Sequence, residues 1–537
     1  MDISKVLKKH GQEHLLKYYD ELDIEKQNHL IKQIMDIDFE EIEELYQLTT
    51  KKEKTKSSNI KPLQGVETID PKWPAVGIEL IKRGKYAVVT MAGGQGTRLG
   101  FDGPKGTYIL EYGINKSLFE IQCDKLKEIY SNYKTYVNWY IMTSHDNHEA
   151  TIEFFETNNY FNYPKDKIKF FMQGLLPMLH TNGKVIMDDK HNIKLGPNGS
   201  GGVFKAMLDN GITKKLENDG VEYVFIGGID NVLLPISDPT LIGYAKKEKF
   251  LAASLSVVKD YPEEKVGIFA LKDNKPCILE YIHISEEMAH QRDEKGELVY
   301  SDLNLQAYVF NIEIIKELQD KPLPYSAALK KSDYLDSRGK LKEAKKENAY
   351  KFELFLFDIF PYMDKIGLIR EKRCNAFAPV KNKDGVDSPE TASKLYKDYH
   401  QKSKIKPCWK VCLALLVGIG IAIWGLALYF KMLEVGSSCE TPTLAMFPIG
   451  IKLLFLLLVL PVGVIAEMVA HLLSKKKNDI REYYRAKIIW LILILVIITP
   501  IIIFIFGRFA LIWCFIAILP ILLLIIYNSY RFIKYKK

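Results

Sequence analysis

The chain has 537 residues, of which 47% are hydrophobic and 26% charged, a composition that excludes a disordered protein and leaves room for two or more domains. Residues 401–537 contain 17 Lys and Arg against 5 Asp and Glu, a net charge of +12. Because the whole chain carries +8, residues 1–400 carry −4. The basic character belongs to the C-terminal tail and gives no argument for nucleic-acid binding.

The N-terminal region is predicted to be helical. Residues 1–9 are charged and contain no apolar stretch, so we expect no cleavable secretory signal. Apolar residues then recur at helical spacing, and a polar linker follows at residues 51–61. We therefore expect an N-terminal helical segment at residues 1–60 and a catalytic domain at 61–400, with a C-terminal subdomain from about residue 340.

Short β-rich runs alternate with helical patterns after the linker. Ser117 and Glu120 have the spacing of a capping box that opens a helix through residue 130. Strands are predicted at 87–91, 136–142, 168–172, 223–226 and 251–257, and further helices at 148–156, from 202 and at 239–247. This order predicts an α/β fold with a mostly parallel sheet, covered by helices, whose ligands lie at the carboxyl ends of the strands.

A glycine-rich loop directly follows the first of these strands. Residues 91–100 read Met-Ala-Gly-Gly-Gln-Gly-Thr-Arg-Leu-Gly, and residues 103–106 read Gly-Pro-Lys-Gly. Glycines let backbone N–H groups approach phosphate oxygens closely, while Arg98 and Lys105 add positive charge. The loop has neither the Gly-Lys-Ser/Thr ending of a Walker motif nor the glycine spacing of a dinucleotide fingerprint. We expect a phosphate-binding loop of another kind.

The combination of Ala-Gly-Gly-x-Gly-Thr-Arg-Leu-Gly with Pro-Lys-Gly resembles the signature of nucleotide-sugar pyrophosphorylases. Further similar segments narrow the resemblance to the eukaryotic-type UDP-N-acetylhexosamine pyrophosphorylases. They are residues 11–16, 116–119, 173 with 177, 197–202, 229–231 with 238–239, 266–267, 357–360 and 377–382. The resemblance covers roughly residues 10–385 in collinear order and does not include the tail.

This resemblance implies a Rossmann-like, mixed but mostly parallel sheet of the glycosyltransferase-A-like type. It also implies transfer of a uridylyl group from UTP to a sugar 1-phosphate, with release of pyrophosphate. The sugar phosphate is itself the nucleophile, so the protein has to position the substrates and neutralise charge during an in-line displacement at the α-phosphorus.

The resemblance assigns the phosphate contacts to residue types that suit this task. Arg98, Lys105 and Lys381 are implied to stabilise the transition state and the leaving pyrophosphate. Asp230 is implied to hold Mg²⁺ together with phosphate oxygens and water, although an aspartate at the end of a strand can also be a simple cap. The other nucleotide contacts are implied at Met91, Ala92, Gly93, Gly94, Gln173, Gly199 and Lys351.

The sugar contacts implied by the resemblance are Ser200, Gly267, Glu280, Tyr281 and Asn304. Two positions depart from the family pattern. Ser200 stands where the family usually has Asn, and Tyr308 stands where the family has a His four residues after the Asn304 position. These departures bear on the choice of sugar and leave the uridylyl-transfer residues unchanged.

The C-terminal tail is predicted to be a membrane region. After a basic linker at 401–410, residues 411–537 hold four apolar stretches long enough to span a bilayer, at 411–430, 453–473, 488–506 and 509–530. Basic clusters precede the first stretch, separate the second from the third and end the chain. The positive-inside rule therefore places the catalytic domain and the C-terminus in the cytosol. The endoplasmic reticulum is compatible with this topology, but the sequence does not identify the organelle.

The leading interpretation is a membrane-tethered UTP:N-acetylglucosamine-1-phosphate uridylyltransferase that uses Mg²⁺, UTP and a hexosamine 1-phosphate and binds no nucleic acid. One alternative is a UDP-glucose or broad UDP-sugar pyrophosphorylase. The other is an inactive, nucleotide-sugar-binding membrane sensor or scaffold, which the joint presence of the expected cations and Asp230 disfavours. A transporter function for the tail is disfavoured because its apolar stretches contain few polar residues.

Overall fold

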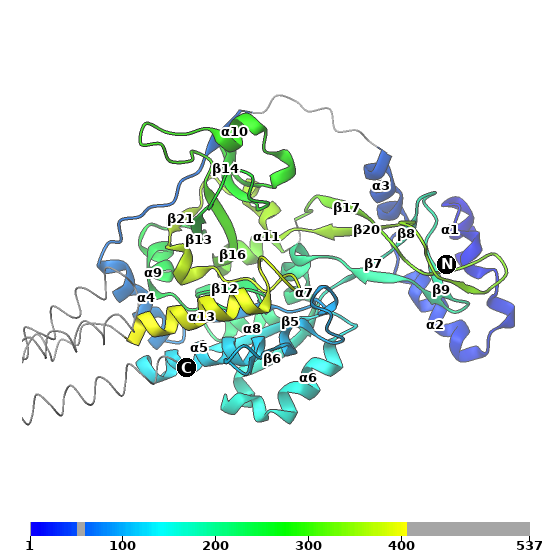
Figure 1. Ribbon diagram of the computed structural model, residues 1–537. Coiled ribbons are helices and arrows are strands. Elements are labelled where there is room, and N and C mark those ends of the chain that lie inside the picture. Colours follow the sequence, from blue (N-terminus) through cyan, green and yellow to red (C-terminus); the bar gives the residue numbers. More distant parts are fainter. Residues whose placement is uncertain (1, 51–58, 320, 405–537) are drawn as a thin grey trace, which may run out of the picture. The chain divides into compact units, whose positions relative to one another are not determined.

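The computed structural model describes residues 2–50, 59–319 and 321–404 (Figure 1). Residues 1–396 form one compact unit, and only the first residues of a second unit, 397–537, are described. Across the described ranges, no helix combines the length and the apolar character needed to cross a bilayer. The four apolar stretches predicted as membrane spans lie outside the described residues.

The compact unit contains both helices and strands. The helices of the described residues are α1 (Ile3–Lys9), α2 (Ile24–Met35), α3 (Phe39–Thr50), α4 (Lys72–Lys82), α5 (Leu118–Tyr133), α6 (His148–Thr157), α7 (Val203–Asp209), α8 (Ile212–Asn218), α9 (Pro239–Lys247), α10 (Glu286–His290), α11 (Ile312–Leu318), α12 (Arg373–Ala376) and α13 (Pro389–Lys404). The large sheet contains β1 (Ile60–Pro62), β2 (Tyr86–Met91), β5 (Asn138–Thr143), β6 (Ile168–Met172), β12 (Tyr223–Gly228), β13 (Ala252–Val258), β14 (Ile268–Lys272), β15 (Lys275–Leu279), β16 (Asp302–Asn311) and β21 (Gly367–Arg370).

The predicted elements up to residue 258 are confirmed with small shifts. Helix α9 and strand β6 have the expected bounds, whereas β5 begins two residues later than predicted. Ser117 caps α5, since its hydroxyl accepts the N–H of Glu120 at 3.0 Å. Local signals were sufficient here because each strand is a short buried run and each helix has a recognisable start.

The sheet is mixed, as the resemblance implies, but it is not mostly parallel, because antiparallel pairings are at least as frequent as parallel ones. Strands β12, β2, β5 and β6 are parallel neighbours in the order β6-β5-β2-β12. On the other side of β12, strand β16 runs antiparallel to both β12 and β13. Strands β14 and β15 form a hairpin, and β14 and β16 are antiparallel as well. Only the first half of the domain alternates strands with crossover helices, which parallel pairing requires.

The N-terminal helices pack on a smaller β region at one end of the compact unit (Figure 1). Its strands are β7 (Leu175–Pro177), β8 (Leu179–His180), β9 (Met187–Asp189), β10 (Asn192–Ile193), β11 (Leu195–Pro197), β17 (Tyr325–Lys330), β18 (Tyr334–Leu335), β19 (Leu341–Lys342) and β20 (Ala349–Leu354), while β3 (Ile109–Leu110) and β4 (Lys116–Ser117) pair elsewhere. Leu7, Leu15 and Leu30 share a buried cluster with Leu179 and Phe352. The helical segment is therefore tied to residues far along the chain.

The predicted C-terminal end of the linker is wrong. Residues 60 and 61 were expected in a polar linker, but Ile60–Pro62 is β1 and pairs antiparallel with β14. The run of lysines before it hid this strand, since a three-residue edge strand has no periodicity to read. The division of the chain into the predicted domains otherwise stays a prediction.

Candidate active site

The glycine-rich loop after β2 folds back on itself. The N–H of Ala92 donates to the carbonyl of Met142 at 2.8 Å, which ties the loop to the end of β5. The N–H of Lys105 donates to the carbonyl of Gly94 at 3.0 Å and so closes the loop. A Cβ added at Gly94 would meet nothing within 4 Å, so the backbone at this residue borders open space. This is the arrangement expected of a backbone that receives a ligand's phosphates.

Gln173 and Gly199, two of the predicted nucleotide contacts, each pack closely against neighbouring backbone. A Cβ at Gly93 would lie 2.9 Å from Oε1 of Gln173, so the amide of Gln173 packs directly on the loop backbone. Gly199 has φ +88°, and a Cβ there would lie 2.5 Å from the carbonyl oxygen of Leu354. Only glycine fits this close approach of the 197–202 loop to β20.

Asp230, Lys105 and Lys381 form an ionic cluster at the carboxyl end of β12. The ammonium of Lys105 lies 3.4 Å from Oδ2 of Asp230, and these side chains are 17% and 35% exposed. Burial alone would raise the pKa of the Asp230 carboxyl, but the charges of Lys105 and Lys381 and the Lys105 hydrogen bond lower it overall. The carboxylate is therefore ionised at neutral pH, paired with Lys105 and stabilised by the charge of Lys381.

Backbone and side-chain bonds bring Lys381 to Asp230 from a distant part of the chain. The N–H of Val380 donates to the carbonyl of Asp230 at 2.7 Å. The buried side chain of Asn231 accepts the N–H of Ala378 at 2.9 Å and donates to the carbonyl of Ala376 at 2.7 Å. Asn231 was not predicted as a site residue, although its place next to Asp230 in the matched motif was a usable signal.

Helix α5 supports the loop that carries Asp230. Gln122 donates to the carbonyl of Gly228 at 3.1 Å. The ammonium of Lys125 donates to the carbonyls of Val232 and Leu234 at 2.8 and 2.7 Å. Burial lowers the pKa of Lys125 to about 7. Neither side chain was predicted from the sequence, although Gln122 is buried and Lys125 half-buried on an otherwise apolar helix face.

Two predicted phosphate contacts do not belong to the cluster of Lys105, Asp230 and Lys381. Arg98 is exposed on the turn after the glycine-rich loop, and no other described residue pairs with its guanidinium. Lys351 lies on β20 beside Gly196 and forms an ion pair of 2.6 Å with Glu353. The structure thus brings together Lys105, Asp230 and Lys381 and leaves the roles of Arg98 and Lys351 as predictions.

Three of the predicted sugar contacts meet where β14, β15 and β16 approach one another. The N–H of Asn304 donates to the carbonyl of Gly267 at 2.9 Å, and a Cβ at Gly267 would lie 3.0 Å from Oε1 of Glu280. Burial raises the pKa of Glu280, while the charges of His283 and Lys381 oppose this shift. Lys381 therefore acts electrostatically on both Glu280 and Asp230, so it connects the sugar end of the site to the phosphate end.

The remaining sugar candidates lie at the edge of this group. Tyr281 is 45% exposed at the start of a short 3₁₀ turn (Tyr281–His283). The hydroxyl of Ser200 accepts the N–H of Leu356 at 3.2 Å, so it links the 197–202 loop to the 3₁₀ segment Leu356–Tyr362. Asp358 of that segment was not predicted. Burial, and then the charge of Glu280, raises the pKa of its carboxyl to about 6.

The described residues contain no group of three or more His, Cys, Asp or Glu side chains that could enclose a metal ion. Asp230 is the carboxylate that pairs with Lys105, and Mg²⁺ is commonly bound by one or two carboxylates together with substrate phosphates and water. The cluster therefore fits a magnesium ion that arrives with the nucleotide.

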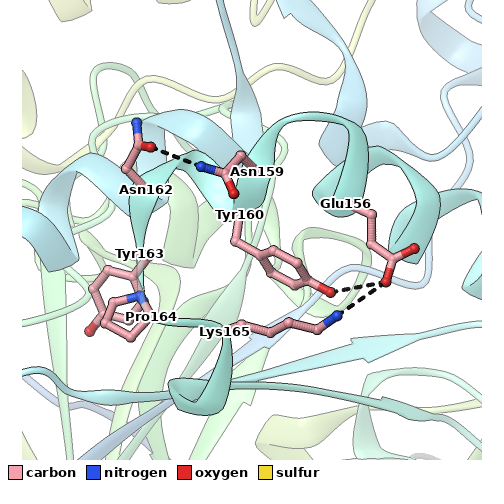
Figure 2. Close-up of a pocket in the computed structure, with 7 residues that line it drawn as sticks. All are labelled: Glu156, Asn159, Tyr160, Asn162, Tyr163, Pro164 and Lys165. Atoms are coloured by element: carbon pink, nitrogen blue, oxygen red, sulfur yellow. Dashed lines mark hydrogen bonds and ion pairs between the residues drawn. The ribbon is translucent and has the colours of Figure 1, made fainter.

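A surface cavity of about 630 Å³ contains none of the predicted site residues. Figure 2 shows its lining at the end of α6 and the turn that follows, namely Glu156, Asn159, Tyr160, Asn162, Tyr163, Pro164 and Lys165. Glu156 accepts from Tyr160 at 3.3 Å and pairs with Lys165 at 3.4 Å, and Lys165 covers the ring of Tyr160. Its charged groups are satisfied locally.

The chain is similar in sequence and in structure to known proteins. A sequence profile of the family described as UTP–glucose-1-phosphate uridylyltransferase matches residues 36–420. The UDP-N-acetylglucosamine pyrophosphorylase of Saccharomyces cerevisiae is 38% identical over 60% of this chain and 70% of its own length. A probable UDP-N-acetylglucosamine pyrophosphorylase of Dictyostelium discoideum is 32% identical over 73% of this chain and 87% of its own.

The chain belongs to the UDP-N-acetylglucosamine pyrophosphorylase family. It is therefore a uridylyltransferase, as the sequence predicts. A solved structure of the Trypanosoma brucei UDP-N-acetylglucosamine pyrophosphorylase with an inhibitor has a TM-score of 0.64 at 26% identity and covers 81% of this chain and 91% of that one. A putative enzyme of the same kind from Entamoeba histolytica has a TM-score of 0.60 at 29% identity, over 65% of this chain and 90% of that one. The mixed sheet is thus the fold of this family.

Proposed function

We propose that this chain forms UDP-N-acetylglucosamine and pyrophosphate from UTP and N-acetylglucosamine-1-phosphate. The observation that carries the proposal is the position of Lys381, whose charge acts on Asp230 beside the glycine-rich loop and on Glu280 beside Gly267 and Asn304. A nucleoside triphosphate on the loop and a sugar phosphate against Glu280 would then bring their phosphates to the same cation. The curated relatives named for N-acetylglucosamine support this sugar.

The reaction requires no covalent enzyme intermediate. A phosphate oxygen of the sugar phosphate forms a bond to the α-phosphorus of UTP, and the bond from that phosphorus to the bridging oxygen of the pyrophosphate breaks. Lys105 and Lys381 neutralise the charge that develops on these oxygens, and the loop backbone around Gly94 donates to the phosphates. Asp230 would hold Mg²⁺, which when bound supplies additional charge neutralisation.

The experiment for this proposal is pyrophosphate release by the full-length chain, purified in detergent, with UTP, Mg²⁺ and one sugar 1-phosphate at a time. With N-acetylglucosamine-1-phosphate, we expect the chain to release pyrophosphate and to form UDP-N-acetylglucosamine in equal amounts. The family description names glucose-1-phosphate, so that compound is the second substrate to test. Binding of UTP without turnover of any sugar phosphate would contradict the proposal and favour an inactive nucleotide-binding protein.

We also propose that the C-terminal tail anchors the chain in a membrane. The four apolar stretches at residues 411–530 and the basic clusters around them support a multi-pass membrane anchor with the catalytic unit in the cytosol. Alkaline carbonate extraction of cell membranes tests it. The full chain is expected to stay in the membrane pellet, and a chain ending at residue 400 is the matched control expected in the supernatant. Extraction of the full chain would contradict the anchor.

A further inference from the structure

The side-chain amide of Asn304 has a fixed orientation at the sugar end of the site. Its Oδ1 accepts the backbone N–H of Gln306 at 3.0 Å and faces the hydroxyl of Tyr308 at 2.7 Å. A backbone N–H can only donate, so the atom it contacts must be the amide oxygen and not the nitrogen. Because this oxygen is occupied on two sides, the amide NH₂ of Asn304 points away from both.

A bulge in β16 creates this arrangement. Gln306 has φ +54°, and the pairing of β13 with β16 shifts register between Ser254 and Ser256, opposite this residue. The bulge turns the N–H of Gln306 back toward Asn304 and places Tyr308 on the same side. No hydrogen bond among the described residues uses the NH₂ of Asn304, whose backbone N–H donates to the carbonyl of Gly267, the residue next to the Glu280 carboxylate.

The hydroxyl of Tyr308 is itself held in place. The residue is fully buried. Its ring packs edge-on against Phe360, with 5.3 Å between ring centroids, and at a tilt against Phe310, with 5.9 Å between centroids. Burial raises the pKa of the phenol, so the group keeps its proton and acts as a donor. Its only freedom is rotation of the O–H bond, which the oxygen of Asn304 directs.

We propose that Tyr308 is a positioning residue that locks the Asn304 amide with its NH₂ facing the sugar. A locked NH₂ is a donor without acceptor capacity, so it selects an acceptor on the sugar. The carbonyl oxygen of a 2-acetamido group and a hydroxyl oxygen both meet this need, whereas a 2-ammonium group does not. The inference rests on the proposed function, because it concerns the sugar bound at the same site.

The first test is Tyr308→Phe in the full-length chain, which removes only the hydroxyl and keeps the ring packing. We expect KM for N-acetylglucosamine-1-phosphate to rise about two- to tenfold, the range for one lost hydrogen bond, with KM for UTP and kcat within twofold. Discrimination against glucosamine-1-phosphate should fall. An unchanged KM for the sugar phosphate, or an equal rise in KM for UTP, would overturn the proposal.

Tyr163→Phe is the matched control. The Tyr163 hydroxyl is also buried and hydrogen-bonded, donating to the carbonyl of Val137 at 2.8 Å, but it lies outside the site. It should lose stability like Tyr308→Phe without any change in the KM for the sugar phosphate. If the two variants shift both KM values alike, Tyr308 has a purely structural role.

A second variant keeps the proposal testable if Tyr308→Phe does not fold. Asn304→Asp leaves the oxygen that accepts from Gln306 and Tyr308 but replaces the NH₂ by a second oxygen. Use of N-acetylglucosamine-1-phosphate should fall at least about tenfold and use of glucosamine-1-phosphate should rise. Retained acetamido selectivity would show that the amide oxygen faces the sugar. If the wild type turns over no sugar phosphate, the proposed function fails, and calorimetric binding of UDP-N-acetylglucosamine to wild type and Tyr308→Phe still decides this inference.

Discussion

The phosphate end and the sugar end of the site are built in different ways. At the phosphate end, Lys105, Asp230 and Lys381 form an ionic cluster fixed by backbone bonds on both sides. At the sugar end, Gly267, Glu280 and Asn304 are joined by hydrogen bonds around a strand bulge. The charged residues of the phosphate end can be identified from a sequence motif. The hydrogen-bond partners at the sugar end depend on the register of a strand, which the motif does not give. The two ends should therefore respond differently to substitution.

The largest effect is expected at the centre of the phosphate end. Asp230→Ala should reduce kcat by about 100-fold or more with every sugar phosphate, because it leaves Lys105 and Lys381 without their shared carboxylate and removes the proposed magnesium ligand. Steady-state pyrophosphate release measures this. Asp219→Ala, which breaks a surface ion pair with Lys215, is the control and should leave kcat unchanged. If the loss of kcat in Asp230→Ala differed between sugar phosphates, Asp230 would act at the sugar end as well, which would contradict this prediction.

Lys381→Met should affect both ends, since its charge acts on Asp230 and on Glu280. We expect kcat to fall about 10- to 100-fold and KM for the sugar phosphate to rise as well. Lys365→Met, in a loop beside Phe250, is a control that should change neither constant. If only the UTP-dependent step changes, Lys381 does not connect the two ends.

Glu280→Gln should act on the sugar end alone. The change keeps the size of the side chain but weakens acceptance from sugar hydroxyls, so KM for the sugar phosphate should rise about tenfold or less while KM for UTP stays constant. Glu286→Gln, in the first turn of α10, is the exposed control. An unchanged KM for the sugar phosphate in Glu280→Gln would show that the Glu280 carboxylate does not bind the sugar.

The smallest effect on turnover is expected at Asp358, which should instead change stability. Its carboxyl has a raised pKa of about 6 in the folded chain, against 3.8 for the ordinary group. The folded chain therefore binds more protons than the unfolded chain between about pH 4 and 6, and stability falls as pH rises through this window. Asp358→Asn removes this fall and should add about 1–3 kcal/mol to the free energy of unfolding at pH 7.5, and little at pH 4.

Urea unfolding at the two pH values checks this prediction. Asp364→Asn is the matched control of opposite sign, because its hydrogen bond to Lys275 lowers the pKa of the exposed Asp364 carboxyl. That variant should gain no stability at pH 7.5. A destabilised Asp358→Asn at pH 7.5 would mean that the ionised carboxylate has a favourable partner in the folded chain.

The sequence was sufficient to predict the parallel half of the sheet and the approach of Lys105 to Asp230. These two residues lie in motifs that follow β2 and β12, and neighbouring parallel strands place such residues at one edge of the sheet. The antiparallel half was not predicted, although residues 302–307 of β16 alternate polar and apolar side chains, because the pairing and the bulge of this strand depend on β13. The partners Asn231, Lys125 and Tyr308 were missed for the same reason, since their roles arise from contacts between distant segments.

The central claim is that Lys105 and Asp230 act as one unit, and a double-mutant cycle on kcat/KM tests it most directly. Lys105→Met, Asp230→Asn and the double variant are compared with the wild type in the full-length chain. Because the two side chains lie 3.4 Å apart, the double variant should lose far less than the product of the single losses. Losses that multiply would show that the two residues act separately and would contradict the account.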